Sequence, residues 1–228
     1  MAETPPPDMV TAQVEDIALV GRRREQIVAA ATKLFSRQGY YKTTVKEIAQ
    51  EADVSPGLIY QYVRDKDDIL LLVLLDCVSG YTREIPPAVA SETHPLAKLR
   101  AAFAAYCRVV DRNRAGAVLA YRSTKSLDGA RRRLVMDQEL RTNALLAECI
   151  ARCIDGGFLR AVNVDLVTYQ LVMAAHSWAL KAWYLGSRFT VEQYIAQSFD
   201  IFSGGLLTAK GQRAMARLSP AEPATPAA

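Results

Sequence analysis

The stretch TVKEIAQEADVSPGLIYQYVRDK, from Thr44 to Lys66, decides how the amino end of this chain folds. Apolar residues recur at helical spacing in its first part, and Thr44 followed by Glu47 forms a capping box at the start of that helix. Ser55 followed by Pro56 marks a second helix start, because a capping hydroxyl before a proline is typical of a helix N-terminus. Two short helices joined by a tight turn predict a helix-turn-helix, whose second helix enters the major groove of DNA.

The second helix begins with small residues and continues with side chains that suit DNA. Pro56 and Gly57 keep its tip narrow, and polar side chains follow that reach phosphates and base edges. At least one of Leu58 and Ile59 is expected to anchor the helix to the helices behind it. The predicted DNA-contacting residues are Arg22, Thr44, Lys46, Ser55, Pro56, Gly57, Tyr60, Gln61, Tyr62 and Lys66.

Positive charge is concentrated around this stretch. Residues 22–66 contain nine basic and five acidic residues, an excess equal to the formal net charge of the whole chain, +4. Such a segment is typical of a module that binds phosphates. The run Arg22–Arg24 stands at a helix start, where the helix dipole disfavours cations. We interpret it as a set of phosphate contacts, the alternative being a solvated basic patch.

These residues resemble the DNA-binding signature of the tetracycline-repressor (TetR) family. The resemblance rests on Val54–Tyr62 with Lys66–Leu70 behind it, and on Ala30–Phe35 with Gly39–Thr44 ahead of it. It covers roughly residues 22–75 and implies a fixed DNA reader followed by a variable helical regulatory domain in a dimer. A two-fold dimer holds two reading helices about 34 Å apart, or a multiple of that, and therefore reads a palindrome.

Long helical patterns dominate the chain and no strand pattern stands out. We therefore expect an all-α fold of about nine helices: an N-terminal three-helix helix-turn-helix domain and a helical regulatory domain that dimerises through a four-helix bundle. The expected segments are a flexible arm (1–20), the DNA-binding domain (21–66), the ligand-binding and dimerisation domain (67–208) and a disordered tail (209–228). A helix over 65–81 should connect the two domains, with Pro86-Pro87 as a boundary after it.

Composition limits the functional class. Hydrophobic residues make up 50% of the chain, which is enough for a core, yet no run of about 18 apolar residues predicts a membrane span and no signal peptide is recognisable. Four scattered cysteines suggest reduced thiols in a cytoplasmic protein, and Cys149 and Cys153 are expected to pack in the core. With two histidines far apart and no nucleophile motif or phosphate loop, we expect no enzyme, no cofactor and no metal site.

Five further helical segments follow, and the last two are apolar nearly all round. Their expected ranges are 96–110, 115–126, 128–155, 165–186 and 190–207. A helix that is apolar on all sides is buried on two sides, so we expect one side of each of the last two helices to face the protomer core and the other to face a twin subunit. The predicted dimer-interface residues are Trp178, Phe199, Phe202 and Leu206.

Polar and aromatic residues inside these apolar patterns are the candidates for effector binding. The predicted ligand-binding residues are Tyr106, Arg122, Lys125, Tyr169, Met173 and His176. Arg122 and Lys125 lie about one turn apart, and they either receive phosphates or a carboxylate, or form a surface pair. His176 is interpreted either as a hydrogen-bonded core histidine or as a ligand contact. The run Arg131–Arg133 is expected on a solvated face.

The segments Tyr121–Leu127 and Ala175–Lys181 are similar to the regulatory domain of TetR-type regulators of fatty-acid and steroid degradation, which respond to acyl-CoA thioesters. This resemblance covers roughly residues 115–206. It implies that Arg122 and Lys125 meet CoA phosphates and that the acyl chain lies among Tyr106, Met173 and His176. The sequence thus predicts a ligand-responsive dimeric repressor of a palindromic double-stranded DNA operator, with an acyl-CoA as the leading effector. The alternative is a sensor of apolar drugs or aromatic compounds, whose pocket needs no phosphate ligands.

Overall fold

The structure, a computed structural model, describes residue 10 and residues 12–218. These residues form eleven α-helices, one 3-10 helix and a single β-bridge between Leu159 and Leu207. The elements are α1 (Ile17–Gln38), α2 (Val45–Glu51), α3 (Pro56–Ile59), α4 (Lys66–Ala90), α5 (Pro95–Arg112), α6 (Arg114–Ser123), η1 (Thr124–Ser126), α7 (Gly129–Asp155), α8 (Val164–Leu180), α9 (Ala182–Leu185), α10 (Val191–Gly204) and α11 (Ala209–Leu218). The all-helical class is confirmed, with more helices than the sequence predicts.

Helices extend into both segments that the sequence predicts as an arm and a tail. α1 begins at Ile17 because the carboxylate of Asp16 accepts the backbone N–H of Leu19 at 3.0 Å and caps the helix. α11 occupies 209–218, and its buried Gly211 packs so closely on the backbone of Phe158 that a Cβ atom would not fit. The remaining parts of the predicted arm and tail, residues 1–9, 11 and 219–228, lie outside the described residues.

The helix that connects the two parts of the chain is longer than predicted. α4 continues through Pro86 and Pro87 to Ala90, although the prolines were expected to mark a boundary. Both prolines are exposed, whereas Ile85 and Val89 pack against the core. The helix therefore loses two backbone donors on a side open to water, and the packing of its other side keeps it helical.

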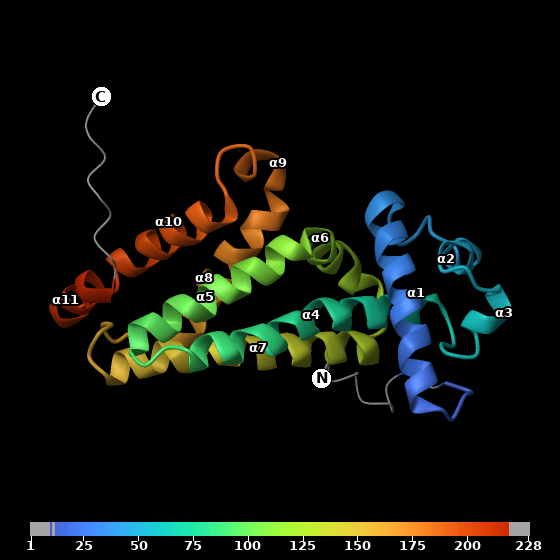
Figure 1. Cartoon of the computed structure of the whole chain (residues 1–228), viewed down its shortest axis with the longest axis horizontal. Helices are drawn as coiled ribbons and strands as arrows, with labels where there is room; N and C mark the ends of the chain where they lie inside the picture. Colours follow the sequence, from blue (N-terminus) through green and yellow to red (C-terminus); the bar gives the residue numbers. More distant parts are fainter. Residues whose placement is uncertain (1–9, 11, 219–228) are drawn as a thin grey trace.

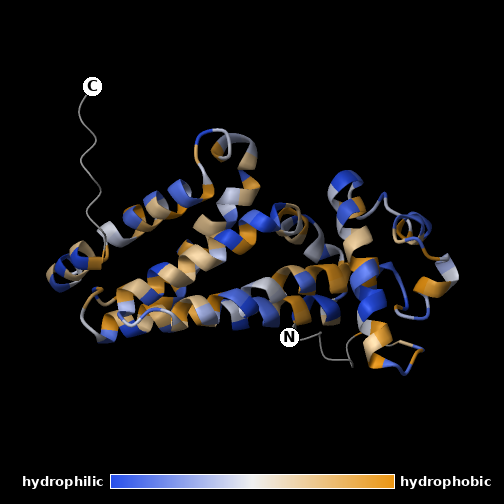
Figure 2. Cartoon of the chain, in the orientation of Figure 1, coloured by the Kyte–Doolittle hydropathy of each residue, from blue (hydrophilic) through white to orange (hydrophobic). Residues whose placement is uncertain are grey.

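α4 contributes to two hydrophobic cores. The first core contains Ile27 of α1, Ile48 of α2, Ile59 of α3 and the run Ile69–Leu75 of α4. The second contains Ile85 of α4 together with residues of α5, α7, α8 and α10. Figure 1 shows α1, α2 and α3 at one end of the molecule, with α4 leading away from them into the regulatory helices, and Figure 2 shows hydrophobic residues on α4 where it passes α1. A displacement of α4 would therefore disturb the packing of both domains.

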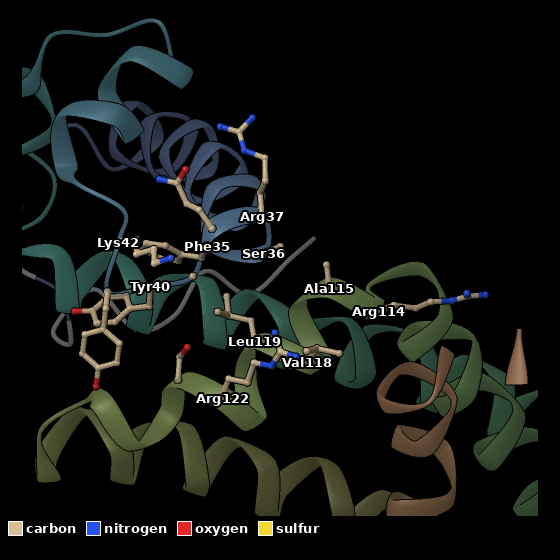
Figure 3. A pocket seen from close by; sticks show the side chains of 14 residues that line it. Phe35, Ser36, Arg37, Tyr40, Lys42, Arg114, Ala115, Val118, Leu119 and Arg122 are labelled. Carbon is tan, nitrogen blue, oxygen red and sulfur yellow. The ribbon is translucent and has the colours of Figure 1, made fainter. Parts of the chain in front are cut away.

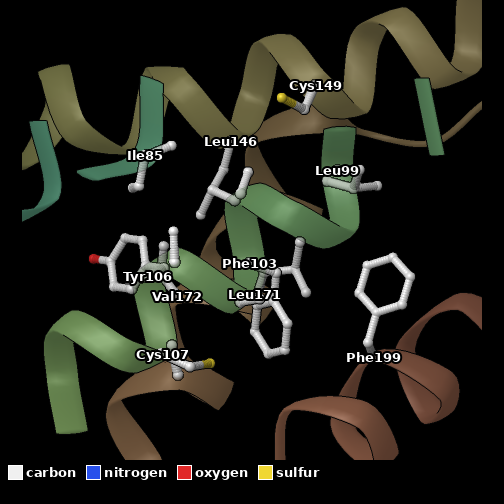
Figure 4. Close-up of a cluster of buried hydrophobic side chains, with 14 of the residues drawn as sticks. Ile85, Leu99, Phe103, Tyr106, Cys107, Leu146, Cys149, Leu171, Val172 and Phe199 are labelled. Carbon is white, nitrogen blue, oxygen red and sulfur yellow. The ribbon is translucent and has the colours of Figure 1, made fainter. Parts of the chain in front are cut away.

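The core of the regulatory domain includes two residues predicted for the dimer interface. Figure 4 shows Phe199 of α10 facing the cluster formed by Phe103, Leu171 and their neighbours. Trp178 of α8 is buried, and its Nε1 donates to Oδ1 of Asp111 at 2.6 Å. The interface assignment of Trp178 and Phe199 is thus wrong, because an all-round apolar pattern does not tell which side of a helix faces its own core.

The regulatory core also contains the two cysteines of α7. Cys149 and Cys153 are free and buried, which confirms the prediction that they pack in the core. No helix within residues 12–218 has both the length and the hydropathy needed to cross a membrane.

Candidate DNA-binding surface and effector site

The second helix of the helix-turn-helix, α3, is presented at the surface. The side chain of Ser55 caps it by accepting a backbone N–H of the first turn at 3.2 Å, and Pro56 and Gly57 are exposed at its tip. Asp53 takes a left-handed backbone conformation, with φ of 53°, in the turn before the helix, a conformation that aspartate tolerates. Ile59 is fully buried and anchors the helix to the domain core.

Most of the predicted DNA-contacting side chains are accessible. The exposed ones are Arg22, Thr44, Lys46, Ser55, Pro56, Gly57, Tyr60 and Gln61. The capping box at the start of α2 is confirmed, because Oγ1 of Thr44 accepts the N–H of Glu47 at 3.2 Å and the Glu47 carboxylate accepts the N–H of Thr44 at 2.7 Å. These groups form a polar surface around α2 and α3.

Tyr62 and Lys66 are less accessible and make contacts within the domain. Tyr62 has only 3% of its surface exposed, and its carbonyl accepts hydrogen bonds from Nε and Nη2 of Arg24 at 3.2 and 3.1 Å. Lys66 donates to the carbonyls of Tyr40 and Thr43 at 3.1 and 3.0 Å and lies over the Tyr40 ring. Tyr62 is therefore not an exposed side chain and Lys66 is half-buried, and the DNA contacts predicted at these two positions stay predictions.

Arg24 is also buried, which contradicts its place in the basic patch predicted for Arg22–Arg24. Its Nη2 bonds to the carbonyl of Val10, and burial lowers the pKa of Arg24. Nearby, the backbone N–H of Gln13 donates to the carbonyl of Gln61 at 2.8 Å. The segment before α1 therefore packs against the end of the reading helix, where the sequence predicts a free arm.

In the regulatory domain, His176 of α8 lies among three tyrosine hydroxyls from three other helices. Its Nδ1 is 2.8 Å from Oη of Tyr121 in α6, and its Nε2 is 3.4 Å from Oη of Tyr81 in α4 and from Oη of Tyr106 in α5. Sδ of Met173 lies 3.3 Å from the Tyr121 hydroxyl. The structure thus brings together three of the predicted ligand-binding residues, Tyr106, Met173 and His176.

This cluster, which we name the His176 cluster, is electrically neutral. Burial lowers the pKa of His176 to about 4, so the imidazole carries one donor and one acceptor nitrogen at neutral pH. Burial also raises the pKa of Tyr81 and of Tyr106 well above the ordinary value, so both hydroxyls stay protonated. Neutral donors and acceptors in an apolar surrounding suit a carbonyl, amide or hydroxyl group of a ligand better than an anion.

α7 adds one buried and one half-buried polar side chain to this part of the domain. Asn143 is 4% exposed, and neither of its amide atoms has a hydrogen-bond partner among the described residues. Burial raises the pKa of Glu139, whose carboxylate also contributes to the raised pKa of Tyr121. Tyr81, Tyr121, Glu139 and Asn143 were not among the predicted ligand-binding residues. The sequence signal that could have identified such residues is a polar side chain at a position where an amphipathic helix is expected to be buried.

Tyr169 and Lys125 do not join the cluster. Tyr169 lies on the exposed face of α8, and Lys125 is exposed on η1. Arg122 is exposed too, but it lines a groove. The structure therefore separates Arg122 from Lys125, which were predicted as a pair on one helix face, because α6 ends between them and η1 turns the chain.

The groove lies between the end of α1 and α6 and has a volume of about 630 Å³. Figure 3 shows Arg37 and Lys42 on the side of the DNA-binding domain and Arg114 and Arg122 on the side of α6. None of the described residues that line it is acidic. Arg114 forms a salt bridge with Asp111 at 2.5 Å and stacks on Trp178. We name this feature the interdomain groove.

Arg131 at the start of α7 is not on a solvated face. Its Nη2 donates to the carboxylates of Asp65 and Asp68, both at 2.7 Å, and its Nη1 donates to Asp128 at 2.9 Å. The side chain of Asp68 is completely buried and also accepts Nε of Arg64 at 2.9 Å. Arg131 therefore ties the regulatory domain to the first turn of α4, directly behind the reading helix, and the prediction of solvent exposure is wrong for this arginine.

Comparison with known proteins agrees with this architecture. Residues 27–73 match the family described as bacterial regulatory proteins, tetR family, and residues 92–206 match the tetracyclin repressor-like C-terminal domain. The chain is 50% identical over 211 residues to the HTH-type transcriptional regulator HbdR of Aromatoleum sp. (strain CIB), and the match covers 92% of each chain.

Two solved structures share the fold. The ketosteroid transcriptional regulator KstR2 of Mycobacterium tuberculosis has a TM-score of 0.68 at 22% identity, over 86% of this chain and 98% of that one. AibR in complex with isovaleryl coenzyme A and operator DNA has a TM-score of 0.69 at 18% identity, over 78% of this chain and 97% of that one. The helix-turn-helix, the helical domain behind it and the two family matches lead to one assignment. The chain belongs to the TetR family of bacterial helix-turn-helix transcriptional regulators.

Proposed function

We propose that this regulator is a dimeric repressor that binds a palindromic operator and leaves it when an acyl-CoA thioester binds. The effector class rests mainly on α6, whose Tyr121 joins the His176 cluster and whose next residue, Arg122, lines the interdomain groove. A neutral cluster suits the thioester carbonyl and acyl chain, and a groove with four cations suits phosphates. An acyl-CoA contains both kinds of group.

The relatives support this effector class. KstR2 of Mycobacterium tuberculosis is described as a repressor and a ketosteroid regulator, and AibR was solved with isovaleryl coenzyme A together with operator DNA. A regulator of the same fold therefore binds a CoA thioester. We carry the effector class, and not the particular acyl group, over to this chain.

The demands of DNA binding support the proposed dimer. The reading helix α3 has four residues, which is too little for tight specific binding by one copy, whereas two copies on a two-fold axis read two half-sites. Large apolar side chains are exposed on α8, α9 and α10, namely Leu166, Trp183 and Ile201. We propose these as the centre of the dimer interface, with the half-buried Phe202 and Leu206 beside them.

An operator-release experiment tests this function. DNA from upstream of the gene, carrying a fluorescent label, is titrated with the purified chain, and the complex is then titrated with short-, medium- and long-chain acyl-CoA. We expect binding to a palindromic site and release by at least one thioester at micromolar concentration. A coupling of about 1–3 kcal/mol between the two sites would suffice for such release. If no thioester releases the DNA, the effector class is wrong.

A pair of variants separates the acyl-CoA function from the alternative, a sensor of apolar drugs or aromatic compounds. Arg122→Ala removes a cation of the interdomain groove, whereas Lys125→Ala removes a cation that does not line it. We expect Arg122→Ala to need more acyl-CoA for release and Lys125→Ala to behave like the wild type. Release of both variants by an uncharged aromatic compound at the wild-type concentration would favour the alternative.

A further inference from the structure

We infer that the interdomain groove binds the phosphorylated nucleotide end of the effector, so that one ligand contacts the DNA-binding domain and the regulatory domain together. This inference rests on the proposed function. It adds ligand contacts from the DNA-binding domain, which forms the second wall of the groove. The residues involved on the DNA-binding side are Arg37 and Lys42, which the sequence did not single out as ligand contacts.

The groove has the size and walls of a ligand site. Its volume of about 630 Å³ lies within the usual range of about 300–1,000 Å³ for small-molecule sites. One wall consists of residues 35–42, at the end of α1 and the turn after it, and the other of residues of α6. Phe35, Val118 and Leu119 supply apolar surface between the charged side chains. The groove thus combines an apolar lining with a charged rim.

The charges of the groove are unbalanced. Four cations and no acidic residue line it, and only Arg114 has a salt-bridge partner, Asp111, within the part of the chain that the structure describes. Arg37, Lys42 and Arg122 therefore leave an excess of positive charge along a concave surface, where the field is focused. A ligand with several phosphate charges relieves this repulsion and accepts hydrogen bonds from both walls.

An aromatic ring beside the cations favours a nucleotide over a simple polyanion. Tyr41 lines the groove and is 76% exposed, and its hydroxyl is held 2.7 Å from Oγ of Ser126 on η1. A fixed, exposed ring provides a stacking surface for a purine, because every base has a π-face. Phosphate-binding arginines and a stacking tyrosine together match the adenosine phosphate end of CoA.

The α6 wall of the groove lies on the side of α1 opposite to α2 and α3. Figure 1 shows α6 on the side of α1 that faces the regulatory domain, whereas α2 and α3 lie on the other side. A duplex read by α3 therefore does not fill the space against α6. A ligand in the groove ties the end of α1 to α6 and so fixes the orientation of the reading helix relative to the regulatory domain.

Binding of CoA and of adenosine 3′,5′-bisphosphate to the full-length chain, measured by calorimetry without DNA, tests the inference. We expect the double variant Arg37→Ala/Lys42→Ala to bind both probes at least about tenfold more weakly than the wild type. The double variant Arg132→Ala/Arg133→Ala, which removes two exposed cations of α7, is the matched control and should bind like the wild type.

A second variant tests the groove from its other wall without changing the DNA-binding domain. Ala115→Glu adds a carboxylate to the α6 wall, and Ala144→Glu adds the same charge to the exposed surface of α7. Only Ala115→Glu should weaken the binding of both probes, and thermal melting checks that both variants fold. Wild-type affinity in Arg37→Ala/Lys42→Ala and in Ala115→Glu would overturn the groove assignment while leaving operator release by acyl-CoA intact. Conversely, groove-dependent binding of the bisphosphate without release by any thioester would support the groove and reject the proposed effector.

Discussion

His176 shows how one side chain is held in an unusual state by its surroundings. Its imidazole is surrounded by the hydroxyls of Tyr81, Tyr106 and Tyr121, and burial lowers its pKa to about 4 from 6.5. Between these two pH values the unfolded chain binds more protons at this position than the folded chain does. Stability from the neutral ring is therefore complete above pH 6.5 and is lost as the pH falls towards 4.

This difference predicts a pH-dependent stability that His176→Asn reduces. The free energy of unfolding of the wild type should fall between pH 6.5 and pH 4 with a contribution of up to about 1.4 kcal/mol per pH unit from His176. Urea unfolding of the wild type and of His176→Asn at several pH values measures it. The variant should be less stable at neutral pH and show a shallower pH dependence. Equal slopes for the two proteins would contradict the lowered pKa of His176.

On the DNA-binding surface, Lys46 is the residue whose charge gives a testable prediction. It is exposed at the start of α2 and forms no salt bridge with another described residue, so its charge is available for a phosphate. Lys46→Ala should weaken operator binding by about five- to tenfold and reduce the slope of log affinity against log salt by about 0.9. Arg141→Ala, on the exposed face of α7, is the control. An unchanged salt slope for Lys46→Ala would show that Lys46 does not contact the DNA.

The sequence located the reading helix but not which of its neighbours point outward. Ser55, Pro56 and Gly57 are local signals, because a cap and a proline act within one turn. The carbonyl of the buried Tyr62 accepts from Arg24, 38 residues earlier in the chain. The ion pairs of Arg131 likewise cross from α7 to α4, and no local pattern contains such contacts.

At the scale of elements, α4 and α7 are joined by charge at the point where the DNA-binding domain begins. Arg131 contacts Asp65, the N-cap residue of α4, and Asp68, in its first turn. The carboxylate of Asp68 has no exposed surface, and hydrogen bonds from Arg64 and Arg131 keep its pKa low against the effect of burial. The start of α4 is therefore fixed to the regulatory domain by a contact that depends on one arginine.

Removing this contact should weaken both stability and regulation. In Arg131→Gln the carboxylate of Asp68 keeps Arg64 but loses its second partner, which should cost about 1–3 kcal/mol of unfolding free energy. We also expect the effector concentration needed for operator release to change, because α7 no longer holds α4. Arg132→Gln, at the next and exposed position, is the control and should behave like the wild type in urea unfolding and in operator release. Identical behaviour of both variants would mean that Arg131 is a surface charge.

At the scale of the whole molecule, the apolar residues of α8 and α10 fall into two sets, one buried in the protomer and one exposed on its surface. Trp178 and Phe199 are buried in the protomer, whereas Leu166 and Ile201 are exposed. The sequence pattern predicted two buried sides for each helix but gave no means to tell them apart, because both sides are apolar. The exposed set is the one available to a second subunit, and the proposed operator binding depends on it.

A charge placed on this surface should separate the dimer. Ile201 is 83% exposed, so Ile201→Glu leaves the protomer core unchanged, yet it would bury a carboxylate at the proposed two-fold interface. We expect a dimer-to-monomer shift in analytical ultracentrifugation and a loss of operator affinity of at least about a hundredfold, because two linked reading helices bind far more tightly than one.

Leu140→Glu provides the control for this prediction. Leu140, on α7, is also a large apolar side chain, 55% exposed, and lies outside the proposed interface. The variant should remain a dimer and bind the operator like the wild type. If Leu140→Glu were monomeric and Ile201→Glu remained dimeric, the dimer interface would instead lie on α7. That result would also change the account of regulation, because an interface on α7 would lie on the helix that carries Arg131, and pairing of the subunits would then act directly on the start of α4.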